Sequence, residues 1–165
     1  MKNTALFPGS FDPFTIGHEE IVTRALRLFD KIIIAVGANA GKRELLDITT
    51  RVTLIREVFR DEPRVDVSPY TGLTVDYCTL VGASFLIRGL RTAADFEYER
   101  AMGQTNRALN PRVETIFLLT SPHHAFISSS IVRDILLNGG DASPFLPSRL
   151  TRADLGLPPF KGEER

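Results

Sequence analysis

The sequence predicts an α/β protein built on a Rossmann-like, doubly wound, five-stranded parallel sheet. Two observations lead to this prediction. Short apolar segments, several of them rich in Val and Ile, are bounded by Gly, Pro or Asp, as is typical of buried strands. Helical patterns alternate with these segments, and such alternation favours a mainly parallel sheet. The predicted strands are residues 4–7, 31–36, 64–67, 84–87 and 113–119.

An amphipathic helix is predicted between the first two strands. Its apolar residues share one face, whereas its charged residues lie largely off that face. The helix therefore covers the sheet with its apolar side. The residues of the apolar face are Ile21, Val22, Ala25, Leu28 and Phe29.

A second helix is predicted between the second and third strands. Four apolar residues form a stripe at helical spacing. We expect Thr49 or Thr50 to cap the first turn and Pro63 to end the helix. The stripe consists of Val52, Ile55, Val58 and Phe59.

Three further helices are predicted over residues 75–81, 95–109 and 129–137. The last of these has an apolar side, and Gly139 and Gly140 provide its stop. This completes a β–α rhythm in which ligands bind beyond the carboxyl ends of the strands. The apolar side of the last helix consists of Ile131, Val132, Ile135 and Leu136.

The length and hydrophobic content fit one domain. A chain of 165 residues with 43% hydrophobic residues can fill a single core, and we expect that domain to span residues 1–165. The pattern of elements decays beyond Pro147, and Pro158 and Pro159 precede a charged end. We therefore expect the tail, about residues 151–165, to be partly flexible.

The charge balance and the cysteine content exclude several classes of function. The 20 basic and 20 acidic residues cancel, so no overall positive field exists to hold duplex nucleic acid. Cys78 is the only cysteine, which excludes an internal disulfide and a multi-cysteine zinc site and is typical of a reducing compartment. No segment resembles a signal peptide or reaches membrane-spanning length. We expect a cytoplasmic protein with no nucleic-acid or membrane partner.

The segment after the first strand combines the features of a phosphate site. Gly9 allows a close backbone approach and Ser10 offers a hydroxyl. His18 follows in the first turn of the helix, where free amides and the helix dipole favour an anion. A lone histidine at such a place is otherwise a capping or packing residue. The surrounding pattern favours the phosphate interpretation.

Cations follow two further strands. Lys42 comes after the second strand, where it is a candidate ligand for a substrate phosphate, with a merely solvated side chain as the alternative. Arg88 and Arg91 follow the fourth strand and are separated by Gly89 and Leu90. Arginine at a strand end suits a bidentate phosphate clamp, and surface charge on a turn is the alternative.

The helix starts after the fourth and fifth strands add further polar groups. Asp95 is best explained as a helix cap. Glu99, one turn later, is a candidate contact for a nucleotide or metal, with solvated surface as its alternative. Ser128, Ser129 and Ser130 supply a cap and, with the amides behind them, a cradle for the β- and γ-phosphates of a nucleotide. Four strand ends thus converge on phosphate binding.

The motifs carry a resemblance to a known family. Thr15 to His18, after the loop from Pro8 to Pro13, resembles the signature of the nucleotidyltransferase superfamily that shares its fold and histidine motif with class I aminoacyl-tRNA synthetases. With the other motifs in order, residues 5–150 are similar to the phosphopantetheine adenylyltransferase family. The other motifs are Lys42 and residues 87–91, 94–99, 127–130 and 140–141.

The resemblance implies an enzyme of coenzyme A biosynthesis. Such an enzyme transfers the adenylyl group of ATP to 4'-phosphopantetheine and forms dephospho-coenzyme A and pyrophosphate. The resemblance further implies that Mg²⁺ is held through the ATP phosphates, without a direct protein ligand, and that His18 is the catalytic residue that stabilises the transition state. Family members are typically homohexamers and are inhibited by coenzyme A.

The resemblance also assigns binding residues. It places Ser10, Lys42, Thr74 and Arg88 at the acceptor, phosphopantetheine. The implied ATP contacts are Ser10, Phe11, His18, Gly89, Leu90, Arg91, Glu99, His124, Ala125, Phe126, Ile127, Ser128, Ser129 and Ser130.

One departure and two alternatives accompany this interpretation. Where the family usually has Trp or Tyr ahead of Phe126, near the adenine, this chain has His123, His124 and Ala125, so His124 is the candidate to stack there. A related transferase with nicotinamide mononucleotide or an alcohol phosphate as acceptor is one alternative. A non-catalytic sensor of adenine nucleotide or coenzyme A is the other. His18 discriminates against the sensor, which needs phosphate ligands but no group that stabilises a transition state.

Overall fold

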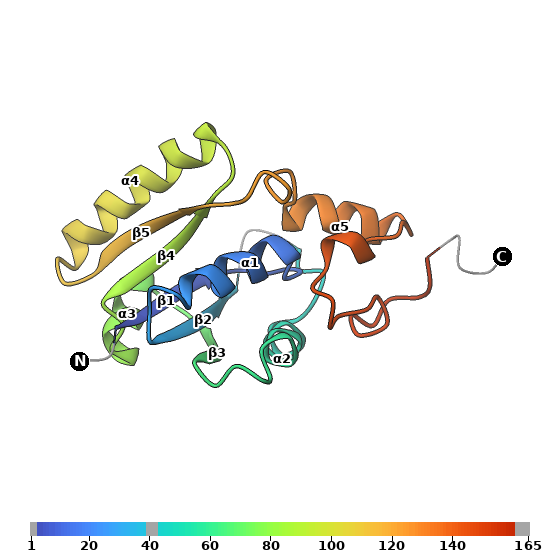
Figure 1. Cartoon of the computed structure of the whole chain (residues 1–165), viewed down its shortest axis with the longest axis horizontal. Helices are drawn as coiled ribbons and strands as arrows, with labels where there is room; N and C mark the ends of the chain where they lie inside the picture. Colours follow the sequence, from blue (N-terminus) through green and yellow to red (C-terminus); the bar gives the residue numbers. More distant parts are fainter. Residues whose placement is uncertain (1–2, 39–42, 161–165) are drawn as a thin grey trace.

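A computed structural model of the protein describes residues 3–38 and 43–160. It contains a parallel five-stranded sheet with strand order β3-β2-β1-β4-β5 (Figure 1). The α/β, Rossmann-like prediction is therefore confirmed. The strands are β1 (Thr4–Gly9), β2 (Lys31–Gly37), β3 (Val65–Tyr70), β4 (Phe85–Leu90) and β5 (Glu114–Leu119).

Helices connect successive strands and cover the sheet. The last helix and the segment after it lie beyond the carboxyl ends of the strands (Figure 1). No helix within residues 3–38 and 43–160 is long and apolar enough to cross a bilayer. The helices are α1 (Ile16–Ala25), α2 (Ile48–Val58), α3 (Thr74–Val81), α4 (Ala93–Leu109), α5 (Ser129–Leu137) and the short 3-10 helix η1 (Ser143–Phe145).

The core has one layer on each face of the sheet because neighbouring residues of a strand point to opposite faces. In β2, Ile32 and Ile34 pack with residues of α1 and α2, whereas Ile33 and Ala35 pack against α3. This central strand is buried on both sides, which explains its nearly continuous apolar sequence. A third cluster, around Leu136 of α5, lies beyond the strand ends.

The ends of the predicted strands and helices needed correction where local signals compete. β3 continues to Tyr70 through Pro69, because it is an edge strand and a proline can occupy an edge. Asp47 caps α2 in place of Thr49 or Thr50, since its carboxylate accepts hydrogen bonds from the Thr50 amide and hydroxyl, at 2.9 and 2.7 Å.

Two residues predicted to be buried on helix faces are exposed. α1 ends at Ala25, so Leu28 falls in the following turn and is 57% exposed. Ile131 of α5 is 52% exposed, whereas Val132 and Leu136 on the same helix are buried. After α5, Gly139 takes a positive φ of 75°, which agrees with its predicted role in the helix stop.

The sheet order places a crevice between β1 and β4. The strands β2 and β3 are added on one side of β1, and β4 and β5 are added on the other side. β1 lies between β2 and β4, so the connections from β1 and β4 leave toward different sides of the sheet. Ligands of open α/β sheets bind at such a switch point, outside the carboxyl ends of the strands. The loop after β1 and the turn after β4 meet there.

Candidate active site

Two adjoining cavities open at the carboxyl ends of β1 and β4. The first, here called the histidine pocket, is lined by His18, Arg91 and the serines of residues 128–130, among others. The second, the tyrosine pocket, is lined by Tyr70, Thr74 and side chains of α4. Each has a volume of about 320 Å³, within the range of small-molecule sites. Their common wall consists of Pro8, Gly9, Ser10, Arg88 and Glu99.

His18 is held in a defined tautomer. It is the third residue of α1 and forms a capping box with Thr15. The Thr15 backbone N–H donates to Nδ1 of His18 at 3.0 Å. Because a backbone amide can only donate, Nδ1 must be unprotonated, and the proton of the neutral ring lies on Nε2. The ring therefore offers an N–H donor from the edge opposite Thr15.

The electrostatic surroundings keep the ring neutral. The pKa of His18 is lowered from 6.5 to about 3, chiefly by burial and in addition by the positive charges of Arg91 and Arg88. At neutral pH the ring is therefore an uncharged hydrogen-bond donor. It can stabilise an anionic oxygen without first releasing or taking up a proton.

The loop after β1 has a constrained backbone. Phe11 takes a φ of 49°, a left-handed conformation that is uncommon for residues other than glycine. Its ring is buried and meets the His18 ring edge-on, with 5.1 Å between centroids. A Cβ at Gly9 would lie 2.7 Å from the Phe11 ring, so position 9 requires glycine. The Phe11 ring thus packs against the His18 ring and supports it.

Arg88 and Glu99 form a bidentate ion pair in the common wall. Nε and one terminal nitrogen of Arg88 donate to the two carboxylate oxygens, at 2.8 and 2.5 Å. Its other terminal nitrogen donates to the Pro8 carbonyl at 2.8 Å. Glu99 is the only buried residue of α4, so the solvated-surface alternative for it is wrong. Within the described residues, three of the five N–H groups of Arg88 are engaged.

Arg91 lies at the mouth of the histidine pocket. It pairs with Asp95 at 3.2 Å and donates to the Ile127 carbonyl at 3.4 Å. Asp95 is therefore a partner of Arg91. The cap of α4 is Thr92, whose hydroxyl accepts from the Asp95 amide, so the prediction that Asp95 is the cap is wrong.

The three serines have different partners. Ser128 caps α5 by accepting from the Ile131 amide at 3.2 Å. Ser129 donates to the Pro13 carbonyl at 2.9 Å, which ties α5 to the loop after β1. Ser130 is exposed. All three line the histidine pocket at the positive end of the α5 dipole, which suits an anion.

His124 is engaged away from the pocket. Its Nδ1 lies 2.6 Å from a carboxylate oxygen of Glu20 on α1, and Ser121 donates to the same oxygen at 2.8 Å. Burial raises the pKa of Glu20, yet hydrogen bonds from His124, Ser121 and Arg24 lower it below its ordinary value overall. His124 therefore anchors the segment after β5 to α1.

The predicted site residues within the described part of the chain divide into three groups. The histidine pocket brings together Ser10, Phe11, His18, Arg88, Gly89, Arg91, Glu99, Ile127, Ser128, Ser129 and Ser130. The tyrosine pocket contains Thr74, whose hydroxyl lies 3.1 Å from that of Tyr70. Leu90, His124, Ala125 and Phe126 are outside both sets of lining residues. Lys42 lies outside the described residues.

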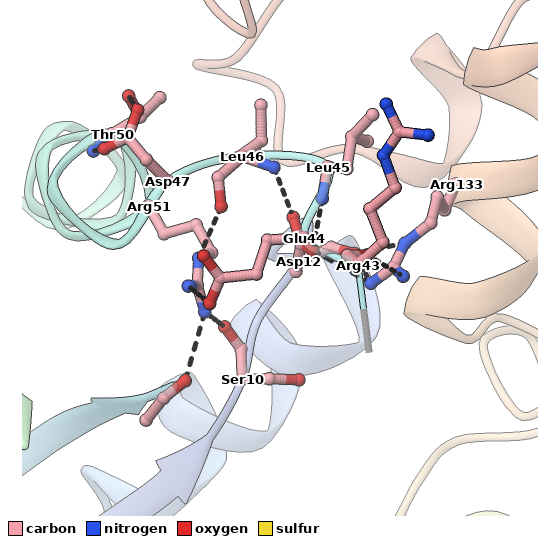
Figure 2. A network of polar contacts seen from close by, with 11 residues as sticks. Ser10, Asp12, Arg43, Glu44, Leu45, Leu46, Asp47, Thr50, Arg51 and Arg133 are labelled. Atoms are coloured by element: carbon pink, nitrogen blue, oxygen red, sulfur yellow. Dashed lines mark hydrogen bonds and ion pairs between the residues drawn. The ribbon is translucent and has the colours of Figure 1, made fainter. Parts of the chain in front are cut away.

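Sequence reasoning missed the charged residues that support the loop after β1. Asp12, Arg51 and Arg133 form a hydrogen-bond network with the segment before α2 (Figure 2). Asp12 belongs to the motif from Pro8 to Pro13, and that was the one available signal. Arg51 falls inside an amphipathic helix, where nothing in the sequence distinguishes it from a surface arginine.

No metal-binding group is evident in the described part of the chain. Among residues 3–38 and 43–160, no three His, Cys, Asp or Glu side chains gather closely enough to hold a metal ion. The two carboxylates of the histidine pocket, Asp95 and Glu99, are each paired with an arginine.

The fold and the anion-suited pocket are typical of a nucleotidyltransferase, and the comparisons with known proteins show that class. The family described as cytidylyltransferase-like matches residues 6–135. The chain belongs to the phosphopantetheine adenylyltransferase family. The member from Flavobacterium psychrophilum is 54% identical over 143 residues, which cover 87% of this chain and 94% of that protein. The member from Cytophaga hutchinsonii is 50% identical over 150 residues, which cover 91% and 100%.

More distant solved structures share the fold. A bifunctional NMN adenylyltransferase/ADP ribose pyrophosphatase from Francisella tularensis, complexed with AMP and a manganese ion, has a TM-score of 0.67 at 17% identity, covering 94% of this chain and 48% of that one. A lipopolysaccharide core biosynthesis protein from Thermoplasma volcanium has a TM-score of 0.54 at 18% identity, covering 73% and 98%.

Proposed function

We propose that this protein transfers the adenylyl group of ATP to 4'-phosphopantetheine, giving dephospho-coenzyme A and pyrophosphate in coenzyme A biosynthesis. The observation that carries this proposal is the neutral His18 ring, which offers an Nε2–H donor in a pocket lined by arginine and serine side chains suited to phosphate. The close relatives named phosphopantetheine adenylyltransferase support the choice of acceptor.

The proposed reaction is an in-line displacement without a covalent enzyme intermediate. An oxygen of the acceptor phosphate forms a bond to the α-phosphorus of ATP, and the bond from that phosphorus to the pyrophosphate oxygen breaks. Negative charge increases on the oxygens of the transferring group, where His18 donates its hydrogen bond. Positioning of the two substrates and stabilisation of this charge provide the catalysis.

The two pockets suit the two substrates. We assign the β- and γ-phosphates of ATP to Arg91 and the start of α5, because a guanidinium and a helix N-terminus both favour anions. Arg88 and Lys42 are assigned to the acceptor phosphate. The pantetheine arm is uncharged and amphipathic, and the tyrosine pocket offers it Thr74 and Asn106 for its amides and Met102 for its apolar parts.

We propose that Mg²⁺ accompanies ATP and is held by phosphate oxygens and water. Asp95 and Glu99 pair with arginines, which leaves the phosphates as the natural oxygen ligands for this cation. When bound, the ion neutralises charge on the leaving pyrophosphate.

Assembly into a homohexamer with inhibition by coenzyme A is a further part of the proposal. α4 buries only Glu99 and exposes Phe96, Tyr98, Met102 and Leu109, so this helix offers an apolar surface to another copy. Light scattering should give six times the 18.3 kDa chain mass, and a monomer would contradict it. Coenzyme A contains the pantetheine arm and should compete with phosphopantetheine for the tyrosine pocket.

Pyrophosphate release tests the reaction itself. The purified protein is incubated with ATP, Mg²⁺ and 4'-phosphopantetheine, with nicotinamide mononucleotide and glycerol 3-phosphate as parallel acceptors. Release only with phosphopantetheine is the expected result. Activity only with another acceptor would reassign the enzyme within its superfamily. The absence of pyrophosphate release with every acceptor would favour the nucleotide or coenzyme A sensor.

A further inference from the structure

Arg51 is a fully buried cation that belongs to neither pocket's lining. It lies on α2 with 1% of its surface exposed, and its guanidinium reaches the segment before the helix and the ends of two strands (Figure 2). Nε donates to the Leu46 carbonyl at 2.9 Å. One terminal nitrogen donates to the carbonyls of Ser10 and Gly37, at 2.6 and 3.1 Å. The other pairs with Glu44 at 2.6 Å.

Asp12 makes a second set of contacts on the opposite side of the loop. Asp12 is 2% exposed, and its carboxylate accepts from the amides of Leu45 and Leu46, at 2.8 and 2.9 Å. Arg133 of α5 donates to the same carboxylate at 2.9 Å and to the Asp12 carbonyl at 3.0 Å. Figure 2 shows Asp12 between this arginine and the segment before α2.

These two residues bracket a strained stretch of backbone. Phe11, with its φ of 49°, lies between the Ser10 carbonyl bound by Arg51 and the Asp12 side chain. A residue in this conformation persists only when surrounding contacts fix it. Ser10 itself is part of the common wall of the two pockets. The network therefore fixes the backbone at the point where the pockets meet.

The hydrogen-bond partners of Arg51 indicate a role beyond fold stability. A buried ion pair is commonly no more stabilising than well-packed apolar side chains. Here, however, three of the four acceptors are backbone carbonyls of three separate segments, after β1, at the end of β2 and before α2. A planar guanidinium with five N–H groups can hold three segments in a fixed arrangement, which an apolar side chain cannot.

We propose that Arg51 and Asp12 are positioning residues that hold Ser10 and residues 44–46 in the arrangement needed for the acceptor phosphate to react. This inference rests on the proposed adenylyl transfer. Neither residue lines the histidine pocket or the tyrosine pocket; both act through the backbone of the loop after β1. Since a displacement of about 1 Å at a reacting centre costs about 100-fold in rate, small shifts of this loop are sufficient for a large effect.

The main test replaces Arg51 by lysine and uses Arg56→Lys as the matched control. Arg51→Lys keeps the buried charge and its attraction to Glu44 but loses the fork of donors. Arg56 lies on the same helix and also donates to a carbonyl, that of Val67, remote from both pockets. We expect Arg51→Lys to lower kcat/KM for phosphopantetheine about 100-fold. Its Kd for ATP should change little, and Arg56→Lys should leave kcat/KM unchanged.

Melting curves and hydrogen exchange separate positioning from stability. If Arg51 only supports the fold, Arg51→Lys lowers Tm but leaves kcat and both KM values of the folded enzyme unchanged, and the inference fails. It also fails if Arg56→Lys causes an equal kinetic loss. Under the proposal, Arg51→Lys and Asp12→Asn both speed exchange of the Leu45 and Leu46 amides. Unchanged exchange in both variants would contradict the role of the network.

A milder variant covers the case in which Arg51→Lys does not fold. Glu44 is 36% exposed on its side chain, so Glu44→Gln preserves the shape of a partly solvated residue and weakens a single contact to Arg51. It should raise KM for phosphopantetheine by roughly threefold, with a normal melting curve. A wild-type protein without turnover would refute the proposed function, whereas an active wild type with unaffected variants would refute only the positioning role.

Discussion

The histidine pocket and the tyrosine pocket are of equal volume and share a wall, yet their chemistry differs. The first contains His18, two arginines and the serine-rich start of α5. The second contains Tyr70, Tyr98, Met102 and Asn106, and its arginine, Arg88, belongs to the common wall. The first is therefore suited to a polyphosphate, and the second to an uncharged arm. Under the proposed function, the reacting groups of the two substrates would meet at the common wall.

The largest expected effect concerns the donor of the histidine pocket. His18→Ala removes the Nε2–H group and should lower kcat by about 100- to 1,000-fold, as loss of a single transition-state donor does. ATP affinity, measured by calorimetry, should be largely retained. His123→Ala, a substitution of an exposed histidine, is the control. Loss of ATP binding together with turnover would show that His18 is structural. It would also contradict the assignment of the two substrates to separate pockets.

A change in the common wall should affect both pockets. Arg88→Lys loses the bidentate contact to Glu99 and weakens the contact to Pro8, so kcat/KM should fall about 10- to 100-fold for each substrate, the value of a charge-assisted hydrogen bond. Arg107→Lys is the matched control, because Arg107 lies on α4, as Glu99 does, and forms only an exposed ion pair with Glu114 of β5. A loss confined to phosphopantetheine would show that Arg88 serves the acceptor phosphate alone, and a loss confined to ATP would contradict its assignment to that phosphate.

A change in the tyrosine pocket should affect only the acceptor. Thr74→Val removes the hydroxyl that lies 3.1 Å from that of Tyr70, and KM for phosphopantetheine should rise about two- to tenfold, as expected for one neutral hydrogen bond. KM for ATP should stay constant. Thr79→Val tests a hydroxyl of the same helix outside the pocket. An equal change in the KM for ATP would contradict the separation of the two pockets.

The smallest effect is a predicted lack of titration. Because the folded-state pKa of His18 is lowered to about 3, its ring should remain the neutral Nε2–H tautomer in nitrogen NMR spectra from pH 8 to about pH 5. The unfolded chain takes up this proton below about pH 6.5. His18 therefore reduces folding stability as the pH falls from 6.5 toward 3 and has no such effect above 6.5. A ring that titrates near pH 6.5 would refute this assignment.

Local patterns were sufficient to predict most of the fold. The alternation of short apolar segments with helical stripes predicted every strand, because Ile32 to Val36 and similar runs can be buried only inside a covered sheet. Errors occurred at the ends of elements, where one hydrogen bond decides. Thr92 and Asp47 are caps because their side chains reach the amides three residues ahead, and neighbouring polar residues looked equally suitable.

The site could be predicted where its residues directly follow strands. His18, Arg88, Arg91 and the serines come together because parallel strands bring their carboxyl ends to one edge. The role of Arg51 could not be predicted in this way, since its partners lie up to 41 positions away in the sequence. The contact of His124 with Glu20 depends likewise on packing between distant segments, 104 positions apart.

Pro69 also has a consequence for how copies of this protein meet. It lies in β3, at the outer margin of the sheet, and a proline has no N–H to offer a further strand. Edge strands interrupted by a proline are poor templates for strand addition, which is the first step of many aggregation routes. The β3 side is thereby protected against uncontrolled growth of the sheet from one molecule to the next.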